Sequence, residues 1–287
     1  MKSIPFSIAT IVLTSFSFCS SDKDELKTVY KLPKSLEEVS GIEWVGSALW
    51  AIEDSGNEND LYRLDENGNI AHTISITDAT NVDWEDLASD QEGNIYIGDF
   101  GNNDNVRQDL CIYKVGKETL TNSETTAAAK TTFSYPDQTA FPPPSSERFY
   151  DVEAFIVYQN HFYLFTKNRS TSSDGSVSLY KIPNQPGAQT ATLLGKFTSC
   201  PDFNTCAITA AAISPDQQKV AILSHDKIWL FKGFTTDKFY EGTKTELPLN
   251  HYSQKEALTF ISDSVLYIAD EKVKKSGGRV YEYMLKD

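Results

Sequence analysis

The sequence predicts an all-β protein that forms a single β-propeller, and a repeated pattern of short strands is the main reason. One unit covers residues 83–115 and contains three apolar, strand-like stretches, the first two joined by the turn at residues 90–94. Short runs of Tyr, Ile, Val, Leu and Phe separated by Gly and Asn favour strands, and no stretch keeps a helical apolar period over several turns. The same arrangement returns four times, at residues 39–64, 152–182, 209–232 and 255–284.

A fourth strand follows each of the first four units, at residues 70–76, 130–135, 193–198 and 243–249. The fifth unit stops at Asp287 without one, and the N-terminal strand at residues 26–32 can fill that vacancy. Four-stranded units closed in this way predict five blades within one domain, residues 26–287. Six blades are the alternative if segment 116–150 contains a degenerate unit.

The composition allows one large domain and excludes some partners. Of the 287 residues, 40% are apolar and 12% aromatic, which is enough for a sizeable core. The formal net charge of −14 makes nucleic acid and anionic lipid poor partners for the surface as a whole. Cations, neutral sugars or a basic protein suit this surface better.

The N-terminus predicts export. Lys2 precedes an uncharged apolar run that ends at Phe18, so residues 1–18 are interpreted as a signal peptide, too short to span a bilayer comfortably. Cys19 resembles the lipidation site of bacterial lipoproteins, and residues 19–25 would then be the lipidated Cys and an acidic linker. We expect an outer-membrane lipoprotein, periplasmic or surface-exposed, held to the membrane by its lipid anchor only. Phe18 departs from the small residue usual before that Cys, so a soluble secreted product is the alternative.

Two further cysteines predict a disulfide. Cys200 and Cys206 enclose five residues of a turn-rich segment in a chain expected to be exported. Zinc binding is the alternative, although no second Cys/His pair accompanies them. Cys111 lies in a strand-like stretch and is expected to pack as an apolar residue.

Several segments carry a family resemblance. Residues 39–42, 49–50, 54–57 and 99–103 resemble the uncharacterised bacterial propellers grouped near the SdiA-regulated, NHL-like and phytase-like esterase domains. The resemblance covers about residues 30–287 and implies propeller architecture. It does not imply one reaction, because this fold serves hydrolases, lyases and pure binding proteins.

Two columns of residues are expected to converge around one channel mouth, because the innermost strand of a blade starts on the face at which the second strand ends. The first column contains Ser40, Glu85, Glu153, Ala210 and Glu256, and the second contains Asp54, Asp99, Lys167, His225 and Asp270. Crowded carboxylates need a cation, a basic partner or a proton. Hard oxygen ligands predict Ca²⁺, with Mg²⁺ as the weaker alternative, and the expected ligands are Glu85, Glu153, Glu256, Asp54, Asp99 and Asp270. The Asp54 and Asp99 loops also fit ordinary turn chemistry.

Two hypotheses for function remain. The chain lacks a Gly-x-Ser-x-Gly elbow, a phosphate-binding Gly-rich loop with Lys, a His-Glu-x-x-His pair and a dinucleotide fingerprint. The first hypothesis is a binding or scaffolding module, expected to be monomeric, that holds a glycan, a peptide or an envelope protein on its loops. The alternative is a calcium-dependent hydrolase of phosphate esters or lactones, in which His225 or Glu153 is the base while Lys167 and Arg169 steady the anion.

Overall fold

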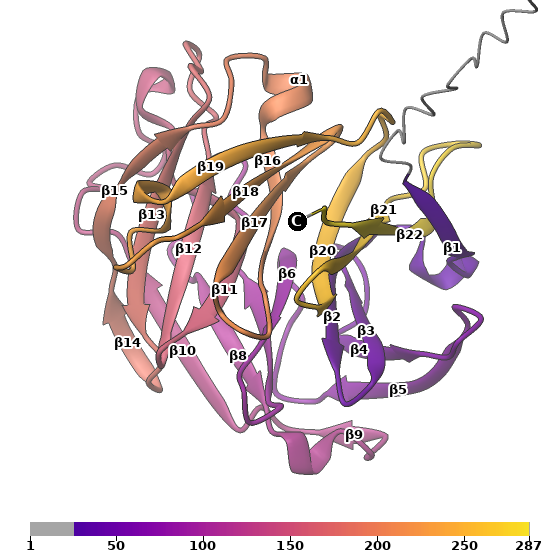
Figure 1. Cartoon of the computed structure of the whole chain (residues 1–287). Helices are drawn as coiled ribbons and strands as arrows, with labels where there is room; N and C mark the ends of the chain where they lie inside the picture. Colours follow the sequence, from indigo (N-terminus) through magenta and orange to yellow (C-terminus); the bar gives the residue numbers. More distant parts are fainter. Residues whose placement is uncertain (1–25, 287) are drawn as a thin grey trace, which may run out of the picture.

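The computed structural model describes residues 26–286, which form a ring of five four-stranded blades around a central channel (Figure 1). The chain is therefore a five-bladed β-propeller, as its repeats predict. The expected signal peptide at residues 1–18, Cys19 and the linker lie outside the described residues.

Each blade is an antiparallel sheet whose first strand lines the channel. Given from the channel outward, blade 1 contains β2 (Val39–Val45), β3 (Ala48–Glu53), β4 (Asp60–Leu64) and β5 (Ile70–Ile76). Blade 2 contains β6 (Trp84–Ser89), β7 (Ile95–Asp99), β8 (Cys111–Val115) and β10 (Ala129–Ser134). Blade 3 contains β11 (Asp151–Tyr158), β12 (His161–Lys167), β13 (Ser176–Pro183) and β15 (Thr192–Thr198). Blade 4 contains β16 (Ile208–Ile213), β17 (Lys219–Ser224), β18 (Lys227–Lys232) and β19 (Thr243–Pro248).

Blade 5 is completed by the other end of the chain. It contains β20 (Lys255–Ser262), β21 (Val265–Asp270), β22 (Arg279–Met284) and, at its outer edge, β1 (Lys27–Lys31). The strands β1 and β22 pair antiparallel, with Thr28 opposite Tyr281. Hydrogen bonds between the first and last strands therefore close the ring, which confirms the prediction for the N-terminal strand.

Two short strands that the sequence did not indicate widen two blades. The strand β9 (Glu124–Thr125) runs parallel to β5, and β14 (Gly187–Thr190) runs parallel to β10. Segment 116–150, where a sixth blade was the alternative, instead supplies β9 and β10. The helical turns are α1 (Phe203–Cys206), η1 (Lys34–Leu36), η2 (Lys117–Thr119), η3 (Ser145–Glu147) and η4 (Phe239–Glu241).

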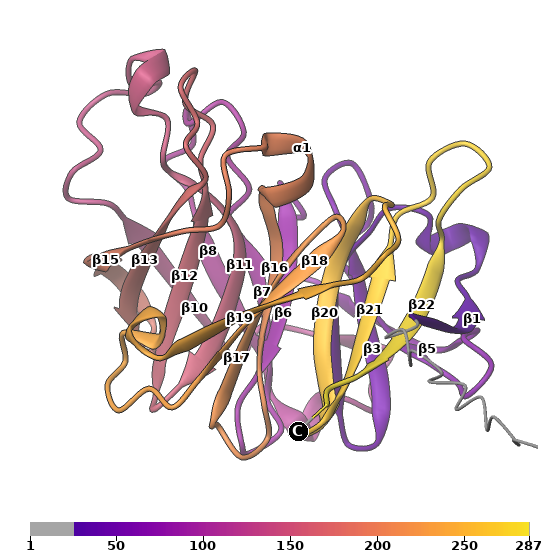
Figure 2. The ribbon, with the colours of Figure 1, turned by 45° about the horizontal axis from the view of Figure 1, so that its top comes forward.

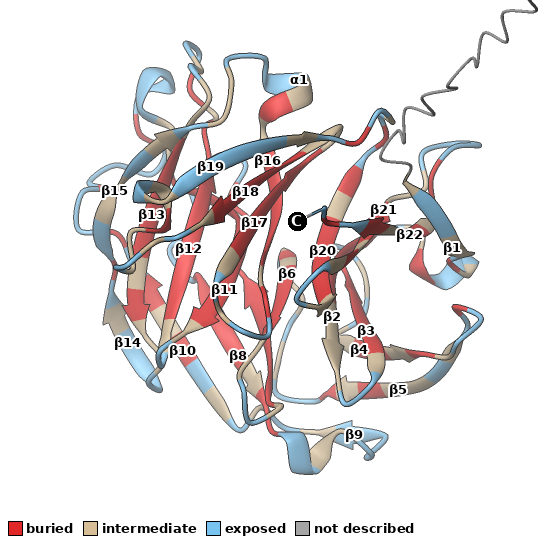
Figure 3. Cartoon of the chain, viewed as in Figure 1, coloured by how far each residue is buried: buried red, intermediate tan, exposed pale blue. Residues whose placement is uncertain are grey.

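Apolar side chains fill the space between neighbouring blades, while the outermost strands face solvent (Figure 3). Between blades 3 and 4, for example, Tyr163 and Phe165 pack with Ile222 and Trp229. Between blades 2 and 3 the rings of Phe100 and Phe155 meet edge to face, with their centroids 5.3 Å apart. Burial of apolar side chains between neighbouring sheets is what holds the blades in a ring.

The two faces of the ring differ in their connections (Figure 2). We call the hairpin face the side on which the first two strands of each blade are joined by tight turns, such as Ser214–Gln217 between β16 and β17. The loop face is the opposite side, which carries α1 and the long connections at residues 136–150, 199–207 and 249–254. Those three connections lead into the inner strands, so they surround the channel mouth.

A β-bulge near the start of every inner strand sets which residues meet at the loop face. The pairing shifts by one residue in each blade, at Ser40, Glu85, Glu153, Thr209 and Glu256. Thr209 therefore holds the position that the sequence assigned to Ala210, a one-residue error that no local pattern reveals. The residue after the bulge is Gly or Ala in four blades and Asp86 in the second; in chain order these are Gly41, Asp86, Ala154, Ala210 and Ala257.

Asp86 joins three inner strands. Its carboxylate accepts hydrogen bonds from the backbone N–H groups of Leu87 (2.9 Å) and Phe155 (3.0 Å), and from that of Ala211. The side chain has no exposed surface, and its burial raises the carboxyl pKa well above its usual range. Asp86 thus connects β6 with β11 and β16 at the axis, where the blades share no continuous ladder.

Glu43 makes the corresponding connection nearer the hairpin face. One carboxylate oxygen accepts from Ser89 Oγ at 2.6 Å and the other from Thr259 Oγ1 at 2.8 Å. These contacts link β2, β6 and β20. Together, Glu43 and Asp86 reach all five inner strands.

Replacing Asp86 by Ala should destabilise the whole domain. The change leaves at least two buried backbone N–H groups without a hydrogen-bond acceptor and creates a void. We therefore expect the free energy of unfolding to fall by about 2–5 kcal/mol. Urea unfolding followed by circular dichroism measures this loss. Asp65→Ala is the control, because Asp65 accepts comparable backbone N–H bonds in an exposed turn. Equal losses in the two variants would contradict the role given to Asp86.

Candidate functional site

The register of the second strands divides the predicted second column into two groups. Asp99 and Asp270 are the last residues of their strands, in the same position as Glu53, Thr166 and Ser224. The predicted Asp54, Lys167 and His225 lie one position further on, where blade 5 has Glu271 and blade 2 has Phe100. Glu271, not Asp270, is therefore the counterpart of His225 in blade 5.

Asp99 and Asp270 are bound within their own blades. Asp99 Oδ1 accepts from Arg107 Nη2 at 2.9 Å and from the backbone N–H of Asp83 at 3.1 Å. Asp270 accepts from the backbone N–H of Arg279 at 2.9 Å and from Tyr281 Oη at 2.8 Å. These hydrogen bonds stabilise the β7–β8 and β21–β22 connections, so both aspartates have a structural role.

Glu153 lies at the centre of a buried ion-pair group on the loop face. Its carboxylate is 3.1 Å from Lys167 Nζ and 2.7 Å from Arg169 Nη2, and Arg169 Nε also lies 2.5 Å from Asp151. Burial alone would raise the pKa of Glu153, but the attraction of Lys167 and Arg169 lowers it. Burial and the repulsion of Glu153 raise the pKa of Asp151 to about 7. The predicted catalytic residues Glu153, Lys167 and Arg169 are thus brought together as partners of one another.

Five other carboxylates face the same mouth without such partners. Within residues 26–286, none of these five has a Lys or Arg nitrogen within 4.0 Å of its carboxylate. The five are Asp54, Asp83, Glu85, Glu256 and Glu271. Burial is the main cause that raises their pKa values, and mutual repulsion adds to it. The pKa is raised to about 8 for Glu256, about 7 for Glu271 and about 6 for Asp54. We call these five side chains the unpaired carboxylates.

Gly101 allows two of these carboxylates to lie side by side. A Cβ atom at Gly101 would collide with both Glu85 Oε1 and Asp83 Oδ2. The pKa of Glu85 is raised well above its usual range, first by burial and then by Glu153 and Asp83. The glycine of the Asp99-x-Gly101 loop, interpreted from sequence as turn chemistry, therefore also makes room for this pair.

His225 lies next to Glu256, with 3.9 Å between His225 Nε2 and Glu256 Oε1. Burial, together with Lys167 and Lys255, lowers the pKa of His225 to about 4, so the imidazole is neutral at pH 7. Glu256, with its pKa raised to about 8, is protonated there. The pair therefore offers a ligand an acidic proton and a neutral ring nitrogen. A cavity of about 240 Å³ is lined by His225 and Glu271.

Lys255 holds the loops beside this cavity, a role that the sequence did not reveal. Its Nζ donates to the carbonyl oxygens of His225 (2.9 Å) and His251 (2.8 Å) and to Ser253 Oγ (2.9 Å). The side chain is fully buried, and burial lowers its pKa to about 8. His225 is therefore positioned through its own backbone by a buried ammonium.

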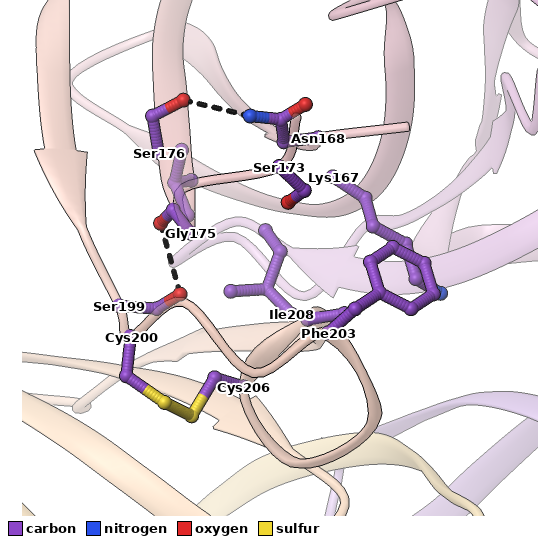
Figure 4. A pocket seen from close by; sticks show the side chains of 12 residues that line it. Lys167, Asn168, Ser173, Gly175, Ser176, Ser199, Cys200, Phe203, Cys206 and Ile208 are labelled. Atoms are coloured by element: carbon purple, nitrogen blue, oxygen red, sulfur yellow. Dashed lines mark hydrogen bonds between the residues drawn. A yellow bond between two sulfur atoms is a disulfide. The ribbon is translucent and has the colours of Figure 1, made fainter. Parts of the chain in front are cut away.

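The predicted disulfide is present and supports the loop over the mouth. Cys200 and Cys206 are bonded, with their Cα atoms 5.4 Å apart. Asp202 caps the short helix α1 by accepting from the N–H groups of Asn204 and Thr205. Figure 4 shows the bridge, Lys167 and Phe203 around a small pocket beside α1. Cys111 is buried as a free thiol, as predicted.

Exposed apolar side chains are concentrated on the loop-face connections. Tyr252 is 61% exposed and stacks on His225, and Phe203 is 39% exposed and lies 5.7 Å from the Arg169 guanidinium. Six of the eight large exposed hydrophobic residues in the described chain belong to loop-face connections: Val82, Val106, Phe141, Phe203, Tyr252 and Val273. We call these six residues the apolar rim.

The contacts limit how calcium could be held. Glu153, Asp99 and Asp270, three of the six predicted ligands, already have protein donors on their carboxylates. Within residues 26–286, no group of three or more His, Cys, Asp or Glu side chains is arranged to hold a metal ion. One calcium ion shared by all six does not fit this arrangement. Calcium binding by the other three predicted ligands, Asp54, Glu85 and Glu256, stays a prediction.

Comparisons with known proteins identify the fold alone. No family model matches the chain, and no curated protein matches it. Among solved structures, it is similar to the PQQ-bound aldose sugar dehydrogenase of Streptomyces coelicolor, with a TM-score of 0.54 and 9% identity, over 91% of this chain and 98% of the other. It is also similar to a protein assigned as a gluconolactonase, with a TM-score of 0.51 and 10% identity, over 89% and 78%. A nidogen/laminin complex reaches a TM-score of 0.46 and 12% identity, over 81% and 72%.

The described chain offers no membrane-spanning helix: none between residues 26 and 286 is long and apolar enough.

The ion-pair group and the unpaired carboxylates should respond oppositely to loss of charge. Glu153→Gln leaves two buried cations with one anion fewer, so we expect a loss of about 2–4 kcal/mol in the free energy of unfolding. Glu85→Gln breaks no ion pair and leaves no buried cation without its partner, so we expect no loss or a small gain. Urea unfolding of both variants at neutral pH measures the difference, and the reverse order would refute the charge assignment.

The stability of the domain should fall as pH rises through neutrality. The pKa values of Glu256, Glu271 and Asp54 are higher in the folded state, which binds more protons and loses stability as these groups ionise. His225 has the opposite effect on stability. Because its pKa is lowered in the folded state, it costs stability only as the pH falls below 6.5, the ordinary pKa of a histidine. We therefore expect the melting temperature to decrease between about pH 6 and about pH 8. Glu256→Gln should flatten this decrease, while Glu92→Gln, on an exposed hairpin, should leave it unchanged.

Proposed function

We propose that this chain is an exported, lipid-anchored binding module whose loop face holds a basic peptide or a basic segment of an envelope protein. The observation that carries the proposal is the set of five unpaired carboxylates at the channel mouth, beneath the apolar rim.

Charge at the mouth favours a cationic ligand. Lys167 and Arg169 form their ion pairs with Glu153 and Asp151, and Arg107 forms its ion pairs with Asp99 and Asp109, so within residues 26–286 the unpaired carboxylates have no direct basic partner. An ammonium or guanidinium group placed among them would relieve their repulsion and restore their ionisation. The net charge of −14 would also attract a basic partner from a distance.

The apolar rim favours a peptide over a bare ion. Aromatic side chains such as Tyr252 and Phe203 are the kind that anchor protein interfaces, since they bury a large area at a small entropic cost. Phe203 is presented by the disulfide loop, and Tyr252 is stacked on His225. Both are thus held at the surface in defined positions, ready to contact apolar residues next to a basic side chain.

Export and anchoring rest on the sequence and on the disulfide. A Cys200–Cys206 bridge is typical of proteins outside the cytoplasm. The signal peptide and Cys19 supply the proposed route to the envelope and the proposed lipid attachment.

A second function is favoured by one contact. His225 and Glu256 lie 3.9 Å apart, and their pKa values are pushed in opposite directions, as in an acid–base pair. His225 is a better base than Glu153, because both oxygens of Glu153 are occupied by Lys167 and Arg169. Hydrolysis of a lactone or a phosphate ester is therefore the alternative, and the gluconolactonase neighbour with the same fold supports the lactone.

Peptide binding should separate the two functions. A fluorescent peptide of alternating lysine and leucine should bind in an anisotropy titration, while a glutamate–leucine peptide should not. The double variant Glu256→Gln/Glu271→Gln and Tyr252→Ala should each weaken binding about tenfold or more, while Glu92→Gln should not change it. Equal binding of the two peptides, or wild-type affinity in both site variants, would refute the proposal. Turnover of a lactone or a phosphate monoester that His225→Ala abolishes would establish the alternative.

A further inference from the structure

We propose that the hairpin-face mouth of the central channel is a second, separate ligand site, which binds a small organic cation consisting of an amine on an apolar body. A cavity of about 350 Å³ lies there. Residues from all five blades line it, and each lies within the last three residues of its inner strand: Trp44, Ser89, Val157, Ile213 and Phe260. Its size and its position on the propeller axis are those of a small-molecule site.

The lining of the cavity combines apolar and polar side chains. Trp44 and Phe260 contribute aromatic surface, and Val157 and Ile213 contribute aliphatic surface. Trp44 is fixed in place by edge-to-face packing on Tyr267, with ring centroids 6.1 Å apart. Such walls suit an apolar ligand body, and aromatic faces also attract cations.

The carboxylate of Glu43 is part of the lining of the cavity. Its two oxygens accept from the hydroxyl groups of Ser89 and Thr259, which carry no charge, and each oxygen keeps acceptor capacity. Burial raises the carboxyl pKa to about 7. No Lys, Arg or His lines the cavity, and no Lys or Arg nitrogen in the described chain lies within 4.0 Å of Glu43.

This charge pattern selects the ligand class. The other acid of the lining, Asp90, is used by its own turn, where it accepts from Asn94 and Tyr96. Glu43 is therefore the acid available to a ligand. An anion would be repelled by it, and a neutral sugar would leave its charge uncompensated. An ammonium group on an aromatic or branched aliphatic body satisfies both the acid and the walls.

The site is independent of the loop face. Asp86, fully buried at the axis, lies between Glu43 and the unpaired carboxylates along the inner strands. None of the residues that line the hairpin-face cavity belongs to the ion-pair group, the unpaired carboxylates or the apolar rim. A ligand here leaves the proposed peptide site free.

Calorimetric titration with 2-phenylethylamine tests the inference, with 2-phenylethanol as the matched neutral probe. Wild-type protein should bind the amine saturably and the alcohol at least about tenfold more weakly. Glu43→Gln keeps the size and removes the charge, so it should weaken amine binding about tenfold or more. Gln91→Trp, at an exposed position on the rim, should block the mouth without touching Glu43. Circular dichroism melting of each variant establishes that it is folded.

Glu256→Gln, on the loop face, is the control and should bind the amine as wild type does. Absence of saturable amine binding, equal affinity for amine and alcohol, or wild-type affinity in either Glu43→Gln or Gln91→Trp would overturn the inference. If Glu43→Gln does not fold, Gln91→Trp and the comparison of amine with alcohol decide the matter. Failure here leaves the peptide titration on the loop face unaffected, so the two proposals can be judged separately.

Discussion

Asp86 occupies the position on which the geometry of the ring depends. Neighbouring blades of a propeller share no hydrogen-bond ladder, so their inner strands need another polar connection. Asp86 supplies it by accepting N–H groups from three strands, in a layer where the other blades have only Gly or Ala. The small residues let the strands approach closely: a Cβ atom on Gly41 would lie 2.7 Å from Leu87 N. Because the axis is fixed there, the residues one step nearer the loop face are fixed as well.

That close approach explains the chemistry of the loop face. Bulges turn Glu85, Glu153 and Glu256 out of the pairing and toward one mouth, where burial penalises every charge. Lys167 and Arg169 form ion pairs with Glu153 and Asp151 but not with Glu85 or Glu256. A site that keeps uncompensated carboxylates loses stability unless a ligand provides positive charge, and such retained instability is typical of functional sites.

The two ends of the channel offer different recognition. The loop face combines many acids with exposed aromatic side chains on long connections, which suits an extended partner. The hairpin face has tight turns, a larger cavity and the Glu43 carboxylate in its lining, which suits a small molecule. Glu43 and Asp86 separate the two environments while they hold the same five strands together. The fold itself is shared with sugar-active proteins of very low identity, so these sites, not the fold, distinguish this chain.

The sequence by itself determined the five blades, the N-terminal strand that closes the ring and the Cys200–Cys206 bridge, because strand period, turn residues and cysteine spacing are local signals. It also placed Glu85, Glu153 and Glu256 at one mouth. Only the tertiary structure decided that Thr209 takes the place of Ala210 in the first column, since a one-residue bulge changes the direction of a side chain without changing the pattern. It also decided that Glu271, and not Asp270, is the counterpart of Asp54, Lys167 and His225 in the second column. The partners of Asp86 and Glu43 come from distant parts of the chain, and no local signal specifies them.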